Sequence, residues 1–84
     1  MDIKETLAER RIQHGPFDEH ATIERQLRAL MKDYGSKLNS VQEIGLGIIL
    51  HKIARILNGG HQHSDTWKDI AGYALLVEQN ILNE

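Results

Sequence analysis

The chain has 84 residues, 40% of them hydrophobic, with no cysteine and a formal net charge of −2. This length predicts one domain without disulfide staples. The acidic balance excludes a general nucleic-acid-binding surface, which needs a strong positive field. No apolar run reaches the ~18 residues of a membrane span. The charged first residues do not resemble a secretion signal, so a cytoplasmic protein without membrane contact is expected.

Apolar residues recur at helical spacing along the chain, and glycine and proline mark the joints. A capping box of Ser40 with Glu43 is expected to open the third helix, and Asp18 is expected to cap the second. The sequence therefore predicts one all-α domain over residues 1–84. The last two helices should form an antiparallel hairpin, because the turn between them is short. The predicted helices cover residues 2–13, 19–34, 40–58 and 64–82.

The last two predicted helices are apolar on most of their circumference, more than a core of this size can bury. We therefore expect the surplus apolar surface to form the interface of a homo-oligomer. Small residues within these helices predict close helix packing, or else room for a ligand between the helices. They are Gly45, Gly47, Ala54, Ala71, Gly72 and Ala74.

Charged residues occur on both arms of the predicted hairpin. Lys52 and Arg55 share one face of the third helix, and Asp65 and Asp69 share one face of the fourth. Arg55 and Asp69 are comparably distant from the turn, so they are expected to face each other. Two interpretations stay open: a structural ion pair that fixes the register, or cations that bind phosphate or carboxylate while the aspartates orient them or hold a metal.

The first corner of the chain collects a second group of polar and aromatic side chains around a glycine turn. Arg11, His14, Phe17 and His20 lie there, and such turns present side chains and free backbone N–H groups together. These residues are candidates for a ligand-binding site. The alternative is a plain helix-to-helix corner in which Phe17 fills part of the core.

Two stretches of the chain resemble a family of short, uncharacterised helical proteins of phages and prophages. One is Arg11–Phe17 followed by His20, which is similar to an HGPF-like turn. The other is Lys52–Leu57 followed by Asp65–Tyr73, which is similar to a KIARIL…DxWxDIAGYA hairpin. The resemblance covers nearly the whole chain. It implies a phage or prophage origin, hence the host cytoplasm, and supplies no activity to transfer.

The chain bears a more distant resemblance to the all-α nucleoside-triphosphate pyrophosphohydrolases of the MazG and dUTPase type. Those enzymes hold Mg²⁺ with an ExxE motif on one helix and an ExxD motif on the next. Here Lys52 and Arg55 stand at the first motif, and only Asp69 remains at the second, with Asp65 as a substitute. Because Mg²⁺ needs oxygen ligands, no catalytic residue, metal ligand or cofactor is expected.

The first functional hypothesis is an oligomer that binds a phosphorylated, nucleotide-like small molecule. Lys52 and Arg55 would contact the phosphates, and Trp67, Tyr73 or Phe17 would stack on a base. A phage would use such a protein to sequester a host nucleotide or a nucleotide immune signal, as an anti-defence protein.

Two alternatives belong to other classes. One is a Mg²⁺-dependent nucleoside-triphosphate pyrophosphohydrolase with Asp65, Asp69 and Glu43 as ligands. The other is a protein-binding inhibitor that blocks a host enzyme through its apolar helices.

Overall fold

The structure, a computed structural model, describes residues 2–83. Within this range the chain forms four α-helices and no strand, and a kinked turn, η1, follows the third helix. The predicted all-α class is therefore confirmed. The elements are α1 (Ile3–His14), α2 (Phe17–Tyr34), α3 (Ser40–Arg55), η1 (Ile56–Gly60) and α4 (Ser64–Leu82).

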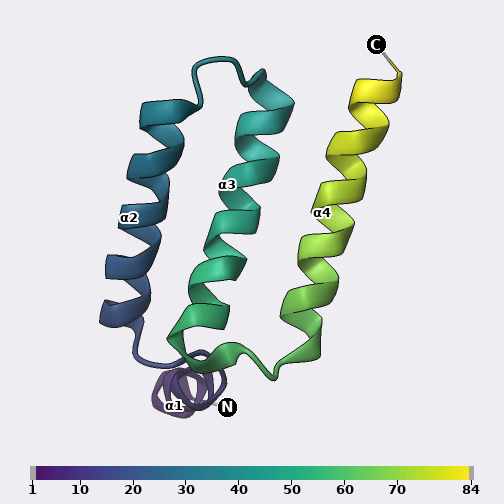
Figure 1. Cartoon of the computed structure of the whole chain (residues 1–84). Helices are drawn as coiled ribbons and strands as arrows, with labels where there is room; N and C mark the ends of the chain where they lie inside the picture. The colour runs from purple at the N-terminus through teal and green to yellow at the C-terminus, as the bar shows by residue number, and fades with distance from the viewer. Residues whose placement is uncertain (1, 84) are drawn as a thin grey trace.

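Helices α2, α3 and α4 lie side by side in one layer, with α3 in the middle (Figure 1). Helix α1 crosses the end of this layer where α2 begins and α3 ends. The chain reverses direction through η1, so α3 and α4 form the antiparallel hairpin that the sequence predicts. No helix within residues 2–83 is both long enough and apolar enough to cross a bilayer.

Glycine allows α3 to approach α4 closely. A Cβ atom at Gly45 would lie 2.5 Å from the Cγ2 atom of Val77, and Gly45, Gly47 and Ala54 are all buried. The prediction of close packing is confirmed for these three residues. It is wrong for Ala71, Gly72 and Ala74 on α4, which are exposed. These residues lie on the part of α4 that α3 does not cover.

Two helix starts differ from the prediction. The capping box of α3 is formed one residue earlier, by Asn39 and Gln42: the Asn39 side chain accepts from the Gln42 backbone N–H at 2.9 Å, and the Gln42 side chain accepts from the Asn39 N–H at 3.1 Å. Helix α2 begins at Phe17 behind Pro16, not behind Asp18. Proline has no N–H and has a fixed φ, so it suits the residue that precedes a first helical turn.

Candidate functional site

The corner between α1 and α2 is fixed to the turn η1 by one asparagine. Asn58 donates through its side-chain amide to the carbonyl oxygens of His14 and Pro16, at 3.0 and 2.8 Å. Between them, Gly15 adopts a φ of 77°, and a Cβ atom there would lie 2.0 Å from the Asn58 carbonyl oxygen. Only glycine fits both the conformation and the space. The corner thereby holds α1 across the ends of α2 and α3.

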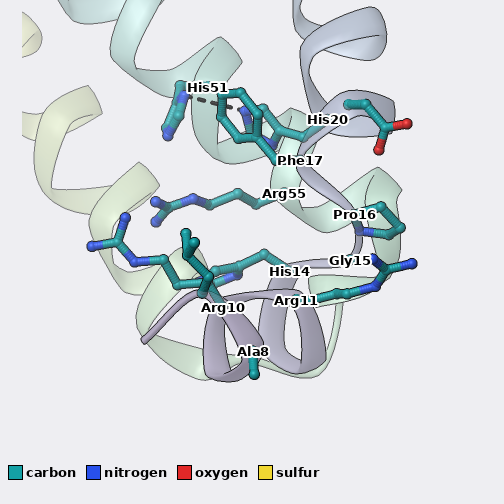
Figure 2. A pocket seen from close by; sticks show the side chains of 12 residues that line it. Ala8, Arg10, Arg11, His14, Gly15, Pro16, Phe17, His20, His51 and Arg55 are labelled. Atoms are coloured by element: carbon teal, nitrogen blue, oxygen red, sulfur yellow. Dashed lines mark hydrogen bonds between the residues drawn. The ribbon is translucent and has the colours of Figure 1, made fainter. Parts of the chain in front are cut away.

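A pocket of about 760 Å³ lies where α1 crosses the layer (Figure 2). This volume falls in the range of small-molecule sites, about 300–1,000 Å³. Apolar side chains and polar side chains both contribute to the wall. The lining residues are Leu7, Ala8, Arg10, Arg11, His14, Gly15, Pro16, Phe17, Asp18, His20, His51 and Arg55.

The charged groups of the pocket are mostly cationic. Arg10 and Arg11 enter from α1 and Arg55 enters from α3, while Asp18 is the one carboxylate of the lining. Within residues 2–83 no carboxylate lies at ion-pair distance from any of these three arginines. In Figure 2, the Arg55 side chain extends between the His20–His51 pair and α1. A half-buried guanidinium with free donors is suited to bind an anion.

His14 lies beside this cation with its Nδ1 atom buried and, in the described part of the chain, without a hydrogen-bond partner. Its ring stacks on that of His63 at a centroid distance of 5.2 Å. Burial lowers the pKa of His14, and the positive charge of Arg55 lowers it further. The imidazole is therefore held in its neutral form near pH 7.

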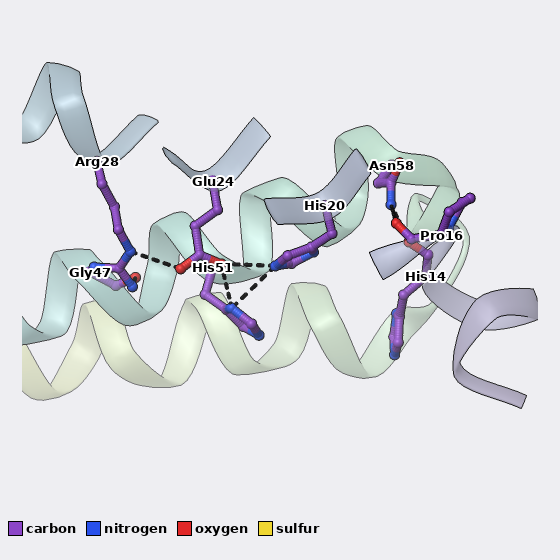
Figure 3. A network of polar contacts seen from close by, with 8 residues as sticks. All are labelled: His14, Pro16, His20, Glu24, Arg28, Gly47, His51 and Asn58. Carbon is purple, nitrogen blue, oxygen red and sulfur yellow. Dashed lines mark hydrogen bonds and ion pairs between the residues drawn. The ribbon is translucent and has the colours of Figure 1, made fainter. Parts of the chain in front are cut away.

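The wall of the pocket between α2 and α3 is a polar network centred on Glu24 (Figure 3). Its Oε1 atom lies 2.8 Å from His20 Nε2 and 2.6 Å from His51 Nδ1, and these two nitrogens are 3.3 Å apart. Its Oε2 atom accepts from Arg28 Nε at 2.7 Å, and Arg28 also donates to the Gly47 carbonyl at 3.2 Å. Glu24 therefore connects α2 to α3 through both carboxylate oxygens.

The environment of this network shifts the pKa values of Glu24 and His51. Burial alone raises the pKa of Glu24, but hydrogen bonds from Arg28, His20 and His51 outweigh burial and lower that pKa from 4.5 to about 2. Burial lowers the pKa of His51; the contact with Glu24 opposes this, and the positive charge of Arg55 adds to the lowering. Glu24 is thus an anion at any physiological pH.

One known protein family matches nearly the whole chain. Residues 3–81 match a family described as a domain of unknown function, DUF6378. The chain belongs to the DUF6378 family. No curated protein and no solved structure matches it.

The structure divides the residues that the sequence singled out in this DUF6378 domain into two groups. One group lines the pocket: Arg11, His14, Phe17, His20 and Arg55. Phe17 is 80% exposed, so the alternative in which it fills the core is wrong. Its ring instead stacks on His20 at a centroid distance of 6.1 Å, at the pocket wall.

The second group lies on or against α4, outside the pocket. Lys52 Nζ is 3.0 Å from Asp69 Oδ2, so the expected pairing of Arg55 with Asp69 is wrong. Arg55 lies about 60° around α3 from Lys52 and nearly one turn further along it, where it lines the pocket together with residues of α1. Asp65, Trp67 and Tyr73 lie on α4 but not in the pocket lining.

Glu24 and His51 of this DUF6378 domain were not among the residues predicted from the sequence. One signal was available, because His20, Glu24 and Arg28 recur every four residues and therefore share one face of α2. Three polar residues in line on the face of α2 that contacts α3 indicate a hydrogen-bonded network between the two helices. Nothing in the sequence shows that His51, 27 residues beyond Glu24, completes it.

Proposed function

We propose that this DUF6378 domain binds a phosphorylated, nucleotide-like small molecule in the pocket between α1, α2 and α3. The observation that carries the proposal is Arg55, a half-buried arginine that lines the pocket without a carboxylate at ion-pair distance in residues 2–83. A charge withdrawn from water needs a counterion. A ligand anion would supply it, in the two-point contact that guanidinium makes with phosphate.

The neighbouring charges favour more than one negative group on the ligand. Arg10 and Arg11 add two exposed cations at the rim of the same pocket, against the single carboxylate of Asp18. Such a field attracts a polyvalent anion from solution and is weakened by salt. A nucleoside di- or triphosphate fits this balance better than a monovalent acid.

The apolar part of the pocket suits the remainder of a nucleotide. Leu7, Ala8 and Pro16 provide apolar wall, and the exposed ring of Phe17 offers a flat face. Stacking of a base on an aromatic side chain is worth about 1–3 kcal/mol. Arg55 and Phe17 therefore replace Lys52, Trp67 and Tyr73 as the residues that we assign to phosphate and base.

We propose further that the chain works as a homo-oligomer. It exposes 6492 Å², about 1,400 Å² more than the roughly 5,100 Å² expected for a monomer of this mass. Among residues 2–83, Ala54 is the only apolar side chain that is fully buried. A stable interface buries about 800 Å² per partner, so the surplus is large enough for such an interface with a second copy.

The exposed apolar residues show where such a partner would pack. Large apolar side chains of α4 are half or more exposed, beside the uncovered small residues of the same helix. They include Leu75, Leu76 and Leu82. The alternative occupant of this face is a host protein, as in the inhibitor hypothesis.

A biological role follows from the resemblance to phage proteins and not from the pocket itself. A small protein that binds a nucleotide suits sequestration of a nucleotide or a nucleotide signal of the host. We therefore propose an anti-defence role in the host cytoplasm.

The pyrophosphohydrolase alternative gains no support from the geometry. Glu43 lies in the first turn of α3 and Asp65 in the first turn of α4. These turns are at opposite ends of an antiparallel hairpin, and Asp69 is bound to Lys52. Three carboxylates so placed cannot share one Mg²⁺, which needs its oxygen ligands in one octahedral shell.

Calorimetric titration of the protein with ATP, without Mg²⁺, tests the proposed pocket. We expect saturable binding that Arg55→Ala weakens at least tenfold. The matched control is Arg25→Ala, which removes an exposed arginine of α2 that does not line the pocket. Equal loss in both variants, or no loss in Arg55→Ala, would contradict the assignment.

A further inference from the structure

Three metal-ligating atoms converge at the pocket wall, on two different helices. His20 Nε2 and Glu24 Oε1 come from successive turns of α2, and His51 Nδ1 comes from α3. The three atoms lie within 4.8 Å of one another, and each is next to both of the others (Figure 3).

Hydrogen bonds satisfy these three atoms only in part. Glu24 Oε1 can accept an N–H from each ring, but then the two ring nitrogens, 3.3 Å apart, both carry hydrogen and make no bond to each other. A single cation at the centre would instead use all three electron pairs. Tetrahedral bonds of about 2.0–2.1 Å place ligand atoms roughly 3.3 Å apart, which is the separation of the two nitrogens here.

The Oε1 atom of Glu24 lies slightly closer to the two nitrogens than this tetrahedral separation, and Arg28 holds the other carboxylate oxygen. The contacts of Glu24 Oε1 at 2.6 and 2.8 Å are hydrogen-bond lengths, so a metal would move the oxygen outward by about half an ångström. Arg28 binds the other oxygen, Oε2, and is itself bound to the Gly47 carbonyl. Partners of this kind orient metal-ligating side chains.

We propose that His20, Glu24 and His51 bind a divalent first-row transition metal such as Zn²⁺ or Co²⁺. Two imidazoles and one carboxylate suit these ions, whereas Mg²⁺ prefers oxygen alone. Three protein ligands leave at least one coordination position for water or a ligand group. Because His20 and His51 also line the pocket, we expect that further ligand to come from the pocket.

The site stands on its own residues and does not depend on the proposed nucleotide ligand. Arg28 binds Glu24 and the charge of Arg55 acts on His51. Both positive charges oppose a metal, so the affinity should be lower than at a site without them. If a phosphate of the ligand completes the metal shell, that further contact rests on the proposed function. The metal site and the nucleotide site are tested separately, with different variants for each.

The test is titration of the full chain, stripped of metal with EDTA and exchanged into clean buffer, with Co²⁺. We expect one Co²⁺ per chain, with visible d–d absorption, that Zn²⁺ displaces. His51→Ala and Glu24→Gln should each weaken Co²⁺ binding at least tenfold. These two residues are less buried than His20, which is 5% exposed, so their replacement disturbs the packing less. Circular dichroism checks that each variant keeps its helix content.

Two controls make the titration decisive. His61→Ala removes an exposed histidine of the η1–α4 turn and should leave Co²⁺ affinity unchanged, whereas a tenfold loss in it would assign the metal to the loop. Arg55→Ala should lose ATP but keep Co²⁺, so failure of the pocket and failure of the metal site give different results. Absence of d–d absorption, or equal Co²⁺ affinity in wild type and His51→Ala, would overturn the proposal.

Discussion

Glu24 Oε1 lies 2.6 Å from His51 Nδ1 and connects α2 to α3 beside the pocket (Figure 3). The two residues are 27 positions apart, and the carboxylate is only 17% exposed. A charge in this position is stabilised by Arg28 on one side and by two imidazoles on the other. The stability of the fold and the shape of the pocket wall therefore depend on the same side chain.

The first prediction concerns the stability of the fold at acid pH. The pKa of Glu24 is about 2 in the folded chain and about 4.3 in an unfolded one. Its contribution, of the order of 3 kcal/mol, is present above pH ~4.5 and is lost as the pH falls toward 2. Urea denaturation of Glu24→Gln in EDTA should show lower stability than wild type at pH 7 and a flatter decline between pH ~4.5 and ~2. Exposed Glu9→Gln should follow wild type.

His14 and His51 extend the same prediction to milder pH. Burial lowers the pKa of each below 6.5 in the folded chain, so the unfolded chain takes up protons first. Stability should therefore begin to fall as the pH drops below about 6.5. His51→Gln should remove part of this early decline in urea denaturation curves measured from pH 8 to 5. An unchanged curve would show that the imidazole titrates as it does in the unfolded chain.

The second prediction concerns the ion pair between Lys52 and Asp69. The side chains are 16% and 46% exposed, so solvent screens the pair. A double-mutant cycle with Lys52→Met and Asp69→Asn should give a coupling of about 0.5–1 kcal/mol. Arg55→Met should show no coupling to Asp69→Asn. Coupling of Arg55 to Asp69 that exceeded that of Lys52 would contradict the observed hairpin register.

The third prediction concerns the clamp between Gly15 and Asn58. Gly15→Ala places a Cβ atom against the Asn58 carbonyl at a positive φ and should destabilise the chain by about 2 kcal/mol or more. Asn58→Ala leaves the His14 carbonyl without its donor and removes one of the two donors to the Pro16 carbonyl, which also accepts the His20 N–H. The change should cost about 1–3 kcal/mol. Because both changes release the same corner, the double variant should lose less than the sum. Thermal melts measure all three.

The helices of this chain are predictable from sequence, but the contacts that build the pocket are not. The spacing of apolar residues predicts four helices because amphipathic periodicity is a local property. Which residue of α3 meets Asp69 depends on how η1 turns the chain, with Gly59 at a φ of 107°, and the length of the turn does not encode that geometry. For this reason Lys52, and not Arg55, meets Asp69. The corner residues were found because Arg11, His14, Phe17 and His20 are neighbours in sequence, whereas Glu24 and His51 meet only through tertiary packing.

The fourth prediction concerns the oligomer. Light scattering should give a multiple of the 9.6 kDa chain mass, because one helical layer leaves its apolar side chains uncovered. Leu76→Glu places a charge on the exposed apolar face of α4 and should dissociate the assembly. Gln62→Glu adds the same charge in the turn before α4 and should not. A wild-type monomer at micromolar concentration would contradict the proposed assembly.

The central claim is that the ligand binds beside Arg55 and not on α4. Nuclear magnetic resonance of the ¹⁵N-labelled chain measures this directly, because arginine Nε–H groups and the single tryptophan indole give separate signals. Addition of ATP should shift the Arg55 Nε–H signal and the backbone amide of Gly15. It should leave the Trp67 indole, which donates to the His61 carbonyl at 2.9 Å, where it was. Movement of the Trp67 signal with Arg55 unchanged would place the ligand on α4 and contradict the account.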